Sequence, residues 1–156
     1  MSNAGAPKTP AIDASGLKIA VVASSWHETI MDGLISGASN YLNNCNASFE
    51  IFRVPGSFEL PLGVKIALAN EFDGAVALGL VLRGDTPHFD YVCDGVTSGL
   101  MQLMLDTGKP VGFGLLTCDT EEQAIARSGL KDMKSNKGLE AAHATIEMSL
   151  LKKKLS

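Results

Sequence analysis

The chain has 156 residues, which is enough for one compact domain and too few for two. Hydrophobic residues make up 46% of it and charged residues 19%, so a folded core is expected and extensive disorder is excluded. The net charge is −4 and no basic face is evident, which argues against nucleic acid as a partner. Residues 1–16 match neither a secretory signal nor a membrane span, so we expect a flexible N-terminal arm, no membrane partner, and a single α/β domain over 17–156.

Three short apolar runs, at residues 19–23, 75–82 and 111–116, predict strands that are buried on both faces, and a weaker run at residues 49–54 completes a set of four strands. Segments with apolar residues at helical spacing alternate with these strands, at residues 30–42, 58–69, 88–107, 120–127 and 139–150. This alternation predicts a three-layer αβα sandwich around a mainly parallel four-stranded sheet. Ligands of such sheets bind beyond the carboxyl ends of the strands, so the loops that follow the strands form the candidate site.

The loop from Arg83 to His88 is the most informative of these. Thr86 is a suitable N-cap and Pro87 suits the first helical position, so a helix is predicted to begin here with free N–H groups that favour an anion. An ordinary capped turn would have the same pattern, and Asp85 would repel an anion unless its side chain turns away. His88 lies where the helix dipole favours a neutral imidazole, which suits acid–base chemistry, although a surface histidine is the commoner case.

The other loops offer candidates that each have a plainer alternative. Trp26 follows the first strand together with His27, and it is either a core anchor or a platform for a flat heterocycle. Ser57 and Glu59 could hold a polyol, or they could belong to a plain turn. Arg127 is either a bidentate phosphate clamp or a solvated arginine.

The remaining ionisable residues are predicted to be structural or solvated. Three lysines, Lys131, Lys134 and Lys137, fall in a charged stretch that is read as a solvated loop, and His143 lies near the apolar stripe of the last helix. The three cysteines, Cys45, Cys93 and Cys118, are odd in number and lack CxxC spacing. This argues against disulfides and against a zinc site, and it indicates a reducing compartment, which we take to be the cytoplasm.

Taken together, these loops resemble the lumazine synthase family of riboflavin biosynthesis. The resemblance covers residues 18–151 and rests on four motifs in order, which are VPGSFELP at 54–61, RGDTPHFDYV at 83–92, EQAIAR at 122–127 and NKG at 136–138. It implies a flavodoxin-like fold and a transferase that condenses 5-amino-6-(ribitylamino)uracil with 3,4-dihydroxy-2-butanone 4-phosphate. The products would be 6,7-dimethyl-8-ribityllumazine, phosphate and water, formed without a metal or other cofactor.

The resemblance also implies an assembly. Residues 129–137 look slightly longer than in members that form large shells, which favours a homopentamer over a shell. The sites would lie at subunit interfaces, the N-terminal arm is available to pair with a neighbouring subunit, and riboflavin synthase would be a functional partner. The alternative is a non-catalytic member of the same family that binds a flavin or lumazine or forms a shell.

Site roles are carried over by the same resemblance. His88 would move a proton, and Asp85, Thr86 and Arg127 would bind the substrate phosphate. Arg127 and Phe113 would come from the adjacent subunit, and Lys137 and His27 are further candidates. The ribitylaminouracil would be held by eight residues: Trp26, Ser57, Phe58, Glu59, Leu80, Val81, Leu82 and Phe113.

Overall fold

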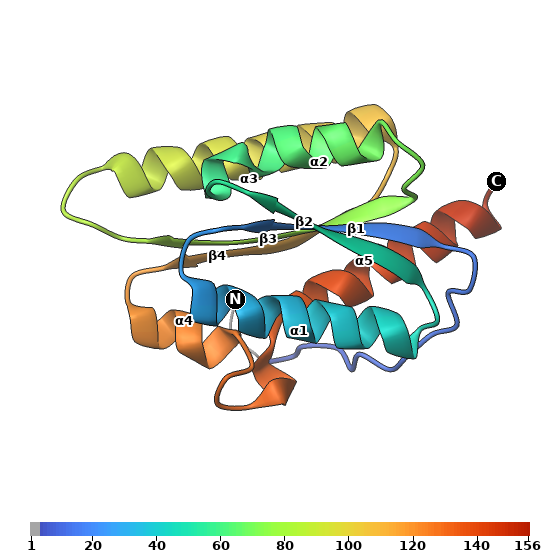
Figure 1. Ribbon diagram of the computed structural model, residues 1–156, viewed down its shortest axis with the longest axis horizontal. Coiled ribbons are helices and arrows are strands. Elements are labelled where there is room, and N and C mark those ends of the chain that lie inside the picture. Colours follow the sequence, from blue (N-terminus) through green and yellow to red (C-terminus); the bar gives the residue numbers. More distant parts are fainter. Residues whose placement is uncertain (1–3) are drawn as a thin grey trace.

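The four predicted strands form one parallel sheet in the order β2-β1-β3-β4 in the computed structural model, which describes residues 4–156 (Figure 1). The strands are β1 (Lys18–Ser24), β2 (Ser48–Val54), β3 (Gly74–Leu82) and β4 (Val111–Cys118). Helices α2 (Leu60–Leu68) and α3 (His88–Thr107) cover one face, while α1 (Glu28–Asn44), α4 (Glu121–Arg127) and α5 (Lys137–Lys154) cover the other. The predicted three-layer sandwich is confirmed, and its strand order is flavodoxin-like.

The chain reverses direction across the sheet between β1 and β3. The connection from β1 passes through α1 on one face, whereas the connection from β3 passes through α3 on the opposite face. The two strands are paired in parallel, with Ala23 opposite Leu78, so their carboxyl ends lie side by side. A crevice forms at such a switch point because the two loops diverge.

Each face of the sheet has its own apolar core. On the α1 and α5 side the core includes Ile19, Leu34 and Ile146, all at 0% exposure, and on the α2 and α3 side it includes Leu60 and Val96. Fully burying one such side chain contributes about 1.5–3 kcal/mol, so these two layers hold the domain together. None of the helices within residues 4–156 combines the length and the apolar character that crossing a membrane requires.

Helix ends follow the predicted signals at one point and depart from them at another. Gly108 stops α3 as predicted, since it adopts a left-handed φ of 65° while its N–H bonds to the carbonyl of Met104. Lys137 does not lie in a solvated loop, because α5 begins at this residue. The amide of Asn136 caps the helix by accepting from Gly138 N and Leu139 N, and Asn136 is only 1% exposed.

The segment before β1 packs against α1 in its last part. The hydroxyl of Tyr41 donates to the carbonyl of Pro10, and Ala14 N donates to the carbonyl of Cys45. Ala14 and Leu17 are buried in the core on this side.

The two outer strands, β2 and β4, each pair on one side only within the described residues, so both edges of the sheet are open.

Gly112 of β4 lies where the backbone of α5 packs tightly against the sheet. A Cβ at this position would overlap the carbonyl oxygen of Ala141 and the hydroxyl of Thr145. We therefore expect Gly112→Ala to lower the free energy of unfolding by about 1–3 kcal/mol, because the helix backbone has to move. Thermal denaturation measures this. Gly84→Ala is the matched control, because nothing lies within 4 Å of a Cβ there; equal stability of the two variants would contradict the interpretation.

Candidate active site

The turn from β3 into α3 presents a helix N-terminus at the carboxyl edge of the sheet. The N-cap is Pro87 rather than the predicted Thr86, because the Pro87 carbonyl already accepts the N–H of Asp90 at 3.0 Å and of Tyr91 at 3.4 Å. The Thr86 hydroxyl instead accepts the N–H of His88 at 3.4 Å. Asp85, Thr86 and His88 are all exposed. An anion can therefore approach the first turn of α3, and the Asp85 carboxylate is free to point to solvent.

A short 3-10 helix, η1 (Ser57–Glu59), lies next to this turn. The Ser57 hydroxyl donates to the carbonyl of Leu80 at 3.2 Å, which fixes η1 against β3. Gly79 makes this approach possible, because a Cβ there would lie 2.7 Å from the Ser57 oxygen. Phe58 is 63% exposed, and its ring would lie 3.3 Å from a Cβ at Gly95 of α3. The segment thus presents an aromatic ring and a carboxylate at the surface.

Trp26 is 66% exposed, which excludes the core-anchor interpretation. Its indole and the carboxylate of Glu59 both flank Gly56, where an added Cβ would lie 3.3 Å from Trp26 Nε1 and 3.2 Å from Glu59 Oε2. His27 is exposed, has a left-handed φ of 56°, and its ring centroid is 6.4 Å from that of Trp26. The structure therefore brings the loops after β1 and β2 together around one exposed aromatic surface.

The three predicted residues at the end of β3 point in different directions. Leu80 is 4% exposed and packs in the α1 and α5 core, as does the partly buried Leu82, whereas Val81 packs in the α2 and α3 core. Because the Leu80 side chain is buried, a ligand at this edge would contact the residues around Leu80 more than Leu80 itself.

The other predicted residues, Phe113, Arg127 and Lys137, form a second group in a groove of about 530 Å³ along the open edge of β4. All residues that line this groove come from β4, α4 and α5, and none belongs to the first group. Phe113 is 51% exposed, and Lys137 Nζ lies 2.8 Å from a carboxylate oxygen of Glu140. Arg127, Lys137 and Glu140 give the groove two cations and one carboxylate.

Arg127 is held in place by the start of α4. Thr120 and Gln123 form a capping box, in which each side chain accepts the backbone N–H of the other residue. The guanidinium of Arg127 donates from Nη1 to the carbonyl of Gln123 at 2.9 Å. The predicted cap at Thr120 is confirmed.

Two other features lie outside the candidate site. Burial raises the pKa of the Cys93 and Cys118 thiols, which keeps them protonated and poorly nucleophilic. No cluster of three or more potential metal ligands occurs within residues 4–156.

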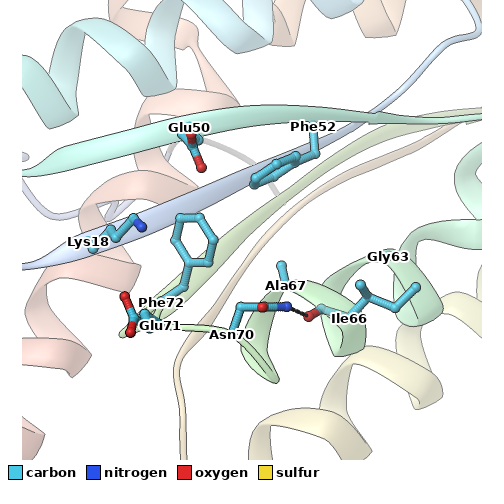
Figure 2. A pocket seen from close by; sticks show the side chains of 9 residues that line it. All are labelled: Lys18, Glu50, Phe52, Gly63, Ile66, Ala67, Asn70, Glu71 and Phe72. Atoms are coloured by element: carbon cyan, nitrogen blue, oxygen red, sulfur yellow. Dashed lines mark hydrogen bonds between the residues drawn. The ribbon is translucent and has the colours of Figure 1, made fainter.

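A hollow of about 610 Å³ lies between β2 and α2, near Lys18 at the amino end of β1 (Figure 2). There the rings of Phe52 and Phe72 meet edge to face, with their centroids 5.6 Å apart.

The fold is that of a flavodoxin-like α/β domain, and it carries the predicted site residues in two separate groups, one around Trp26, Glu59 and His88 and one along the edge of β4. A family model described as 6,7-dimethyl-8-ribityllumazine synthase matches residues 16–153. The chain therefore belongs to the 6,7-dimethyl-8-ribityllumazine synthase family, as the resemblance implied.

Individual relatives agree with this assignment, and each bears the name 6,7-dimethyl-8-ribityllumazine synthase. The chain is 56% identical to the protein of Kocuria rhizophila over 153 residues, covering 96% of this chain and 97% of the relative. It is 50% identical to the protein of Streptomyces coelicolor, covering 94% and 91%, and 51% identical to that of Clavibacter sepedonicus, covering 98% and 97%.

The capping box gives a test of how α4 is fixed. Thr120→Ala removes the acceptor for the N–H of Gln123, and we expect it to lower the free energy of unfolding by about 1 kcal/mol. Urea denaturation measures the change. Thr120→Ser keeps the hydroxyl and should remain close to the parent; an equal loss in both variants would show that the cap is not responsible.

Proposed function

We propose that this chain condenses 5-amino-6-(ribitylamino)uracil with 3,4-dihydroxy-2-butanone 4-phosphate to give 6,7-dimethyl-8-ribityllumazine, phosphate and water, the penultimate step of riboflavin biosynthesis. The observation that carries the proposal is the exposed Trp26 beside Glu59, next to an open helix N-terminus at Thr86–His88. Shared family membership over nearly the whole chain supports it.

The ribitylaminouracil is proposed to occupy the surface formed by the loops after β1 and β2. Trp26 would stack on the pyrimidine ring, because an indole that is two-thirds exposed offers a flat apolar face. The Glu59 carboxylate would accept hydrogen bonds from ribityl hydroxyls, and Ser57 and Phe58 would contribute through η1, which the bond to the Leu80 carbonyl holds still. His27 would border the ring beside Trp26.

The phosphate is proposed to lie at the start of α3. The backbone N–H groups of Asp85 and Thr86, together with the hydroxyl of Thr86, would donate to its oxygens. Arg127 and Lys137, assisted by Phe113 against the ring, would close the site from the β4 groove of an adjacent subunit. The doubly charged anion would then be shared by a helix terminus and two side-chain cations.

The chemistry asks mainly for orientation and proton transfer. One amine joins the ketone with loss of one water, the phosphate of the substrate leaves, and the second amine closes the ring with loss of a second water. There is no net redox change, so the proposed reaction does not require a redox cofactor. Holding the two substrates in one pocket supplies much of the rate, and the exposed imidazole of His88, beside the anion turn, would move the proton.

A homo-oligomer, with a pentamer favoured, is proposed because one protomer carries two separate halves of the site. The open β2 edge supports this, since its exposed Ile51 and Phe52 and the adjoining hollow offer a place for the N-terminal arm of a neighbour (Figure 2). We place the protein in the cytoplasm, where its three free cysteines would stay reduced, and riboflavin synthase would consume the product.

Kinetics of lumazine formation with both substrates test the proposed roles. His88→Ala should lower kcat about a hundredfold and leave the KM of the pyrimidine nearly unchanged, because only proton transfer is lost. Arg127→Ala should raise the KM of the phosphorylated substrate at least about tenfold, because a charge-assisted hydrogen bond is lost. Lys131→Ala, which removes an exposed cation after α4, is the control. Parent protein that binds riboflavin but forms no lumazine would favour the binding alternative.

Mixing of variants tests the proposed interface. If His88 and Arg127 of different subunits form each site, co-assembly of His88→Ala with Arg127→Ala chains should restore about one quarter of the sites. The mass in solution should be about 82 kDa for a pentamer of 16.4 kDa chains. Mixed assemblies that stay as inactive as their components would place both residues in the site of a single subunit.

A further inference from the structure

Arg83, the first residue after β3, ties the anion turn to its surroundings. Its backbone N–H donates to the carbonyl of Cys118 at 3.0 Å, and its side-chain Nε donates to Asp119 Oδ1 at 2.6 Å. Nη1 lies 3.6 Å from the carboxylate of Asp90, and the guanidinium carbon lies 4.3 Å from the centroid of the Phe89 ring. One side chain thus contacts the end of β4 and the first turn of α3, which also carries His88.

The contacts continue from Asp119 to Arg127. Asp119 N donates to the side-chain oxygen of Gln123 at 2.8 Å, the same oxygen that completes the capping box. The carbonyl of Gln123 in turn accepts a hydrogen bond from Arg127 Nη1 at 2.9 Å. Successive hydrogen bonds therefore link Arg83 to Arg127 by way of Asp119 and Gln123, each of which uses its side chain for one bond and its backbone for the other.

The Arg83–Asp119 pair contributes little to global stability. The side chains are 47% and 59% exposed, and ion pairs at such exposure are weak because water and salt screen them. Its geometry is nevertheless well defined, since a guanidinium presents a rigid set of donors. The hydrogen bond to Asp119 raises the pKa of Arg83, so its charge is constant at every working pH. Such a pair fixes positions more than it stabilises the fold.

The pyrimidine surface is fixed by different contacts. The Ser25 hydroxyl donates to the carbonyl of Val54 at 2.8 Å and ties the loop after β1 to the end of β2. Ser57 is bonded to Leu80, and neither contact involves Arg83. Loss of Arg83 would therefore disturb the anion turn and the start of α4 while leaving Trp26 and Glu59 in place.

We propose that Arg83 is a positioning residue that sets the anion turn at Thr86–His88 and, through Asp119 and Gln123, the guanidinium of Arg127. This inference rests on the proposed function, because it assumes that both places meet the substrate phosphate. Arg83 itself touches no reacting atom. Within each protomer it positions both the anion turn and Arg127. A single change at Arg83 should therefore weaken phosphate binding and leave pyrimidine binding largely intact.

The test compares Arg83→Met and Arg83→Lys with the parent in the assembled protein, using titration with inorganic phosphate and steady-state kinetics. In Arg83→Met, phosphate affinity should fall and the KM of the phosphorylated substrate should rise, each roughly tenfold, with the KM of the pyrimidine within about twofold. Arg83→Lys should recover part of the loss, because an ammonium can still reach Asp119 but cannot reproduce the planar set of donors.

Asp119→Ala and a matched control complete the design. Asp119→Ala should reproduce most of the Arg83→Met effect, and the double variant should be no worse than Arg83→Met, since both changes break the same connection. Lys65→Met removes an exposed cation from α2 and should match the parent.

Equal changes in both KM values, unchanged phosphate affinity in Arg83→Met, or additive losses in the double variant would overturn the proposal. If Arg83→Met does not assemble, parent-like phosphate affinity in Asp119→Ala would overturn it. Parent protein that binds phosphate but forms no lumazine would refute the proposed function alone, because phosphate titration still measures the role of Arg83. A parent that does neither would refute both.

Discussion

Parallel pairing of β1 with β3 is the constraint on which the rest of the structure depends. It places two strand ends side by side while their connections leave toward opposite faces of the sheet. The loops after β1 and β2 can then meet at Gly56, and α3 can begin beside them, directly after the turn that follows β3. The polar and aromatic surface exists because the backbone diverges there and leaves it uncovered.

The layers and most of the element ends could be predicted from the sequence because their signals are local. Continuous apolar runs identify buried strands, and the left-handed Gly108 and the capping box at Thr120 mark helix ends through chemistry within a few residues. Helix α3 begins one residue later than its sequence signals predict, since the carbonyl of Pro87 accepts the first helical bonds.

Features that depend on distant neighbours were harder to predict. Lys137 falls in a charged stretch by composition, yet Asn136 caps α5 there because its amide also donates to the carbonyls of Gly33 and Ser128. The exposure of Trp26 could not be decided from its position at a strand end. The sequence alone predicts no role for Arg83 or Asp119. Their pairing can be predicted only once β3 and β4 are known to be neighbours, because one residue directly follows each strand.

The surface position of Trp26 has a practical consequence. It is the single tryptophan of the chain, and it lies beside Glu59 and His27 at the proposed pyrimidine surface. When the protein is excited at wavelengths that its two tyrosines do not absorb, its ultraviolet emission therefore originates at one known place. A heterocycle that stacks on the indole would quench it, which gives a label-free optical signal for ligand arrival in the native protein.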